Sequence, residues 1–172
     1  MAENSIVNEK QMKTHICLFI VSTLLLLPLS QGCTQNVPKD MPKLYSCTLE
    51  ITQGNQPLEG ATVALYHQDS SLQKWTAGGL TDKSGKVVLK TQGRYDGVVD
   101  GNFKVTVIKT EVEPGVLLNA ETEEAIPGKT WNLVEPRFGN VASTPLTLSV
   151  AGKKVSETLD VGTAVKEEMR SY

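Results

Sequence analysis

Three cysteines and two histidines are the side chains of this chain best suited to covalent, acid–base or metal chemistry: Cys17, Cys33, Cys47, His15 and His67. A cysteine thiolate acts as a nucleophile, ligates a metal or carries an acyl group, and a histidine transfers protons or ligates zinc. Three of the five stand in or beside an apolar run near the N-terminus. The chemistry open to the chain therefore depends first on what that run is.

The apolar run covers residues 16–29. A membrane-spanning helix needs roughly 20 apolar residues, so this run is short for a permanent span. It fits the apolar region of a secretory signal, typically about 7–15 residues long, with Lys13 as the preceding positive charge. Two glutamates ahead of Met12 are unusual there, which makes Met12 an alternative start to Met1.

The run ends in Leu-Ser-Gln-Gly-Cys at residues 29–33, which resembles the bacterial lipobox. That resemblance implies cleavage after residue 32 and a diacylglyceryl group on the thiol of Cys33. Each buried CH₂ is worth ~0.8 kcal/mol, so several acyl chains would hold the protein at a membrane. Thr34, rather than aspartate, follows the cysteine, and in proteobacteria this resembles outer-membrane routing. The alternative is an ordinary cleaved signal with a cysteine nearby.

Loss of residues 1–32 would leave 140 of the 172 residues, which is the usual size of one domain. The whole chain has a formal net charge of −2 and no basic tract, so the electrostatic footprint of nucleic-acid binding is missing. Residues 33–42, with two prolines, are interpreted as the lipidated cysteine and a short tether. We therefore expect one tethered domain without a nucleic-acid partner.

Six later segments have the period-2 alternation of half-buried strands. They are residues 43–52, 61–67, 86–91, 103–109, 144–150 and 155–161. In the first, Cys47 points inward with Tyr45, Leu49 and Ile51, so we expect a buried structural thiol. A disulfide between Cys33 and Cys47 would require that lipidation fail. Asp82 and Gly85 predict a tight turn before the third segment.

Other segments are less regular. We expect a short strand around Trp75, a loop over residues 92–102, and an insertion over residues 110–140. Within the insertion, residues 121–126 suggest one helical turn and residues 131–133 an edge strand. The polar tail 166–172 is expected to fray. Together the pattern predicts an all-β, antiparallel Ig-like β-sandwich of about seven strands over residues 43–165.

Three motifs resemble the core of carboxypeptidase-regulatory-like domains, a transthyretin-like group: PLEGATV at 57–63, GLTDKSGKV at 79–87 and GNFKVTV at 101–107. Two shorter matches, at residues 145–146 and 159–161, further resemble small planctomycete lipoproteins that carry this domain. The resemblance covers roughly residues 44–161 and implies a β-sandwich that serves as a structural, accessory or carbohydrate-associated module. In the motifs themselves, the glycines have architectural roles.

Catalysis, metal binding and cofactor binding are not expected. The hydroxyisourate hydrolases of this fold end in Tyr-Arg-Gly-Ser, whereas this chain ends in Met-Arg-Ser-Tyr. After loss of the leader only His67 remains, and at a strand end it is expected to be a plain surface residue. One histidine and one buried cysteine cannot supply a four-ligand zinc site.

The favoured hypothesis is a non-enzymatic, membrane-anchored lipoprotein of the bacterial cell envelope, with a structural or binding role toward an envelope protein or a glycan. One alternative is a small ligand-binding or hydrolytic protein whose pocket lies under the 110–140 insertion. Another is a secreted subunit of a larger assembly that uses an open strand edge. Trp131, the large aromatic of the insertion, either anchors a partner or pins the insertion.

Overall fold

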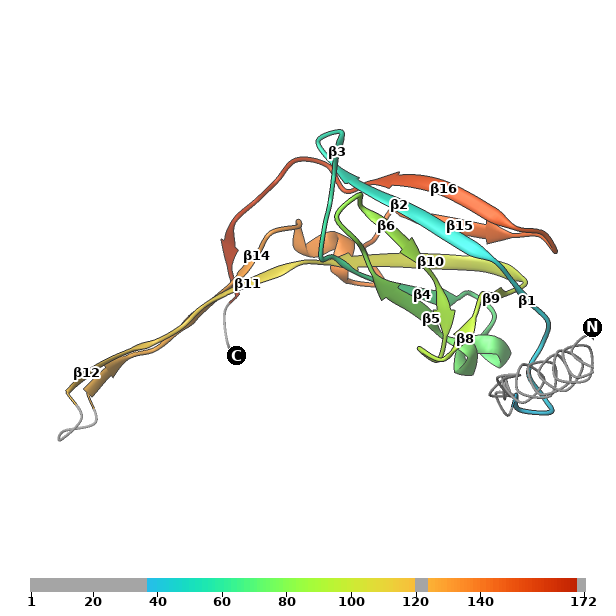
Figure 1. Cartoon of the computed structure of the whole chain (residues 1–172), viewed down its shortest axis with the longest axis horizontal. Helices are drawn as coiled ribbons and strands as arrows, with labels where there is room; N and C mark the ends of the chain where they lie inside the picture. The colour runs from blue at the N-terminus through green and yellow to red at the C-terminus, as the bar shows by residue number, and fades with distance from the viewer. Residues whose placement is uncertain (1–36, 120–123, 170–172) are drawn as a thin grey trace, which may run out of the picture. The chain divides into compact units, whose positions relative to one another are not determined.

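Two β-sheets form most of the computed structural model, which describes residues 37–119 and 124–169 (Figure 1). The predicted signal peptide and Cys33 lie outside the described residues. The larger sheet contains β4 (Thr62–His67), β5 (Ala77–Leu80), β7 (Lys90–Thr91), β8 (Tyr95–Asp96), β10 (Gly101–Ile108) and β15 (Thr147–Val150), in the order β15-β10-β4-β5-β7-β8. The smaller contains β2 (Cys47–Gln53), β3 (Gln56–Pro57), β6 (Lys86–Val88) and β16 (Val155–Asp160), with β2 central. Beside them β1 (Leu44–Tyr45) pairs with β9 (Val98–Val99).

The core lies between the two sheets, and the period-2 predictions for it are confirmed. Cys47, Leu49 and Ile51 of β2 are fully buried. From the other sheet come further fully buried side chains: Val63, Leu65, Phe103, Val105 and Val107. Alternate residues of a strand point to opposite faces, so each sheet contributes one apolar face to the core. The all-β sandwich expected from the sequence is therefore confirmed.

One pairing in the sandwich is parallel. β16 runs parallel to β2, from Val155 opposite Cys47 to Asp160 opposite Thr52. The chain crosses from the larger sheet to the smaller one between β15 and β16, so these consecutive strands do not form a hairpin. An alternating pattern identifies the buried face of a strand but not the direction of its neighbour, so this pairing was not predicted.

The turn predicted before the third strand segment is confirmed. Oδ1 of Asp82 accepts hydrogen bonds from the amide and hydroxyl of Ser84 and from the amide of Lys86. Gly85 has φ +74°, and a Cβ there would lie 2.5 Å from the carbonyl oxygen of Ile51. The turn therefore needs glycine both for its conformation and for its contact with β2.

Two local predictions were wrong. The segment around Trp75 is not a strand but the end of a 3₁₀ helix, η1 (Ser70–Trp75), because the carboxylate of Asp69 accepts from the amide of Ser71 and starts a helical turn. Residues 92–102 are not a loop but contain β8, β9 and the start of β10. The apolar residues between their glycines, including Val98 and Val99, are buried by pairing with distant strands.

The 110–140 insertion begins with a long β-hairpin that runs out beyond both sheets in Figure 1. It contains β11 (Thr110–Glu113), β12 (Val116–Asn119), β13 (Glu124–Ile126) and β14 (Lys129–Asn132). The helical turn predicted over residues 121–126 is therefore wrong at Glu124–Ile126, where pairing with β12 selects the extended conformation. The tail is also paired, because β17 (Glu167–Glu168) adds to β14. After the hairpin comes a second 3₁₀ helix, η2 (Pro136–Gly139).

Candidate functional site

His67 is not the surface residue that the sequence predicted. It ends β4 with 6% of its surface exposed. Its Nδ1 accepts from the amide of Asp69 at 2.9 Å, so Nε2 carries the proton and donates to the carbonyl oxygen of Asp100 at 3.0 Å. Its ring meets the Phe103 ring edge-on, with centroids 4.8 Å apart. Both nitrogens are thus bound to backbone groups, and the imidazole fastens the end of β4 to the turn before β10.

Cys47 is the buried thiol that the sequence predicted. It is 0% exposed, and burial first and the Glu157 carboxylate second raise its pKa to about 11. The reactive form of cysteine is the thiolate, so this thiol is a poor nucleophile at neutral pH. Any disulfide to Cys47 would require β2 to open.

One face of the three-stranded sheet β11-β14-β17 carries a cluster of charges around Trp131. We call it the charged face: Glu111, Glu113, Lys129, Trp131, Lys166 and Glu168. Nζ of Lys166 lies 5.1 Å from the centroid of the Trp131 ring system and Nζ of Lys129 lies 5.6 Å from it. Both ammonium groups are within reach of a cation–π contact with the indole. Since Lys166 belongs to the tail and Trp131 to the hairpin, this contact joins the tail to the hairpin.

The carboxylates of the charged face are matched to these lysines. Lys166 Nζ lies 3.1 Å from Glu113 and 3.3 Å from Glu111. The hydrogen bond from Lys166 first, and the nearby Trp131 indole second, lower the pKa of Glu113. The indole Nε1 is buried and makes no hydrogen bond of ordinary geometry within the described chain. Glu113 and Glu111 in turn raise the pKa of Lys166.

The opposite side of this sheet carries exposed apolar side chains among polar ones. Val112 lies opposite Thr130, whose carbonyl oxygen accepts from the amide of Met169, so these three side chains form one row. Ile108 falls on the same alternation of the strand. We call this surface the apolar face: Ile108 (43% exposed), Val112 (68%) and Met169 (48%). Val116, 56% exposed, continues the alternation into β12.

A hollow of about 230 Å³ opens beside the apolar face. Its lining includes Ile108, Val134, Pro136 and Met169, with Lys109, Asn132, Glu135 and Asn140 among the polar contributors. Gly139 is packed against Ile108, since a Cβ there would lie 3.0 Å from Cγ1 of Ile108. The hollow lies at the junction between the end of β14 and the start of η2. This junction belongs to the 110–140 insertion, under which the sequence suggested a pocket.

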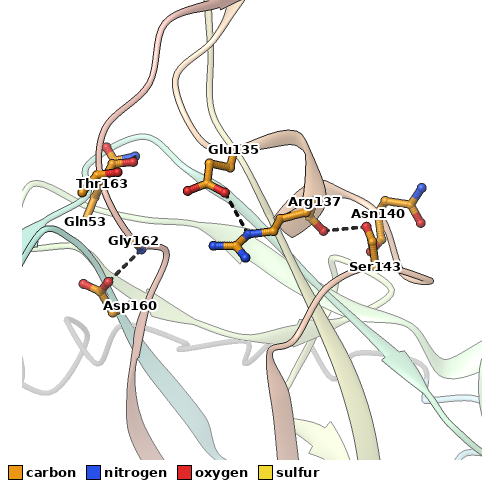
Figure 2. Close-up of polar contacts among 8 residues, drawn as sticks. All are labelled: Gln53, Glu135, Arg137, Asn140, Ser143, Asp160, Gly162 and Thr163. Carbon is orange, nitrogen blue, oxygen red and sulfur yellow. Dashed lines mark hydrogen bonds and ion pairs between the residues drawn. The ribbon is translucent and has the colours of Figure 1, made fainter.

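Figure 2 shows polar contacts around η2, whose Pro136 and Gly139 line the hollow. Nε of Arg137 lies 2.8 Å from Oε2 of Glu135, and the Ser143 hydroxyl donates to the Arg137 carbonyl oxygen at 2.9 Å. On the sandwich side, Oδ1 of Asp160 accepts from the amide of Gly162 at 2.7 Å. These groups satisfy one another, so the carboxylate of Glu135 serves first to fix η2.

The site therefore consists of an exposed apolar face with a hollow beside it. In the described residues no three potential metal ligands among His, Cys, Asp and Glu lie close enough to hold an ion. Nor does that part of the chain contain a helix long and apolar enough to cross a membrane.

Sequence reasoning singled out Trp131 but missed the apolar face. The alternation of Ile108, Val112 and Val116 with Glu111 and Glu113 was the available signal, and Pro114-Gly115 interrupts it.

No protein-family model matches this sequence, and no curated protein matches it either. Among solved structures, a 9R-lipoxygenase from Cyanothece PCC8801 matches with a TM-score of 0.31 and 14% identity. The match covers 74% of this chain but only 18% of the lipoxygenase chain. A likeness this weak carries no argument about fold or activity.

Proposed function

We propose that this chain is a non-enzymatic, lipid-anchored β-sandwich module of the bacterial cell envelope that acts by binding. The observation that carries the binding role is the apolar face, with a hollow beside it. Contiguous exposed apolar surface is characteristic of interaction sites, whereas scattered apolar residues are ordinary. Here Val112 and Met169 lie in one row across the sheet β11-β14-β17, and Ile108 falls on the same alternation just before β11.

The state of the chemistry-bearing residues supports a role without catalysis. Both ring nitrogens of His67 are bound to backbone groups, and the thiol of Cys47 is buried with a raised pKa. A general base needs a free, positioned lone pair, and a nucleophilic cysteine needs an accessible thiolate. Neither residue meets its requirement.

The anchor rests on the sequence of residues 16–33, and intact mass tests it. The native protein is expected to begin at Cys33, to carry two or three acyl chains, and to partition into detergent. A Cys33→Ala variant, which has no thiol to acylate, is expected to lack the lipid mass and to stay in the aqueous phase. Native protein with an unmodified Cys33 thiol and no detergent partitioning would refute the anchor.

The second candidate is a small ligand-binding or hydrolytic protein, favoured by the hollow under the insertion. Sites for small molecules usually measure about 300–1,000 Å³, and at about 230 Å³ this hollow is smaller. Its size fits one or two protein side chains better than a substrate. The hollow therefore supports protein contact more than turnover.

A further inference from the structure

The hairpin has the residue pattern of a buried strand, but its apolar side is uncovered. Along residues 108–116, Ile108, Val112 and Val116 fall on one side of the chain, and Glu111 and Glu113 on the other side are both paired with Lys166. Such alternation normally places the apolar residues against a second layer. Within the described residues no second layer covers Val112, which is 68% exposed. The pattern is that of a strand packed against a second layer, and the described residues do not supply that layer.

We propose that the apolar face is the interface through which two copies of this chain associate. A twofold pairing places the same patch on both partners, so the patch must complement itself. This one does, because it combines protruding aliphatic side chains, Val112 and Val116, with an adjacent hollow of side-chain size. Each copy supplies both the protrusion and the recess.

The charges fit the same arrangement. The carboxylates of Glu111 and Glu113 lie on the charged face, so packing two apolar faces together keeps these like charges apart. Lys109 lines the hollow, and Glu167 lies in the row of Thr110 and Asn132 on the apolar side. Neither forms an ion pair within the described chain. A second copy offers each of them an opposite charge.

This association goes beyond the proposed function, since it does not depend on the anchor at Cys33. A single envelope chain held at a membrane and an unlipidated secreted chain would present the same face. Other occupants, such as a different envelope protein, are outcomes that the following experiment separates.

Cross-linking at single introduced cysteines tests the interface in the full-length chain. Val112→Cys is expected to give a covalent dimer with a short bismaleimide, because the two copies meet at this residue. The matched control is Glu111→Cys, its neighbour on the opposite face, which is expected to give no covalent dimer. The wild-type chain reports any background from Cys33, and the buried Cys47 contributes none.

A second variant measures the strength of association. Val112→Glu places a carboxylate in the apolar face, and because Val112 is exposed in the single chain the fold is expected to persist. Sedimentation is expected to show the dimer's half-dissociation concentration rising at least tenfold. Equal cross-linking at both positions, a cross-link only to a different protein, or a wild-type chain that stays monomeric at every concentration would overturn the proposal.

Discussion

His67 and Gly101 approach each other so closely that each restricts the residue allowed at the other position. Gly101 has φ +136°, and a Cβ there would overlap the His67 imidazole. The imidazole cannot move aside easily, because two backbone groups hold its nitrogens. We expect Gly101→Ala and His67→Ala each to lower the free energy of unfolding by about 2–4 kcal/mol.

Urea unfolding of the two single variants and the double variant measures this coupling. Removing the imidazole relieves the clash, so the loss in the double variant should fall short of the sum by about 1–2 kcal/mol. Gly60→Ala is the matched control: Gly60 has φ +69° and no atom within 4 Å of a built Cβ, so only the backbone cost of about 1 kcal/mol is expected. Strictly additive losses would show that the contact carries no energy.

At this scale the sequence predicted apolar core residues well and polar ones poorly. Cys47 and Phe103 follow the period-2 pattern that burial of a strand face requires, and both were predicted to point inward. His67 falls on the same inward alternation as Val63 and Leu65, but a polar side chain is buried only where partners exist. One partner, the amide of Asp69, is local, but the other, the carbonyl oxygen of Asp100, lies 33 residues later, so local pattern could not reveal it.

β17 joins the tail to the hairpin by pairing with β14, and ion pairs of Lys166 and Lys129 lie beside this pairing. The stability of the pairing therefore depends on pH. The folded-state pKa of Glu113 is lowered from 4.5, so the carboxylate stabilises the pairing above that pH and ceases to as the pH falls through the lowered value. The pKa of Lys166 is raised from 10.5, so its contribution is complete below 10.5 and is lost above it. The pairing is therefore firmest between these limits.

Hydrogen exchange at the amide of Met169, which donates to Thr130, reports this pairing. Protection relative to the intrinsic exchange rate is expected to fall as the pH drops below 4.5, and to fall at neutral pH in a Lys166→Gln variant. Because the charges are exposed, added salt should weaken the pairing as well. Unchanged protection in Lys166→Gln would mean that backbone pairing alone holds the tail.

The hairpin shows why element prediction failed in the insertion. Pro114-Gly115 and Pro127-Gly128 stand opposite each other near its middle and interrupt the alternation of both strands. A window of residues on either side is then too short to identify a strand. Pairing of Val116 with Ile126 and of Thr110 with Asn132 supplies the missing information, and both pairings are non-local.

In the molecule as a whole, the hydrophobic core belongs to the sandwich, and the hairpin contributes no described side chain to it. Of the described side chains, the core cluster and those packed on it include none from residues 110–132, whereas Val134 and Phe138 just after the hairpin belong to the core. The sandwich therefore has the composition of a complete core without the hairpin. The hairpin in turn carries Val112 and Val116, the protruding aliphatic residues of the proposed contact surface.

Exchanging residues 110–132 for Asn-Gly tests this division. The amide of Leu133 donates to the carbonyl oxygen of Lys109 at 2.9 Å, so the two residues form a hydrogen-bonded pair that a two-residue turn can join. We expect the free energy of unfolding to change by less than about 1 kcal/mol, because no core side chain is removed, and self-association to disappear. Deleting β16, which covers one edge of β2, is the control that should unfold the chain. If the Asn-Gly chain fails to fold, the hairpin is part of the folding unit rather than a binding extension of it.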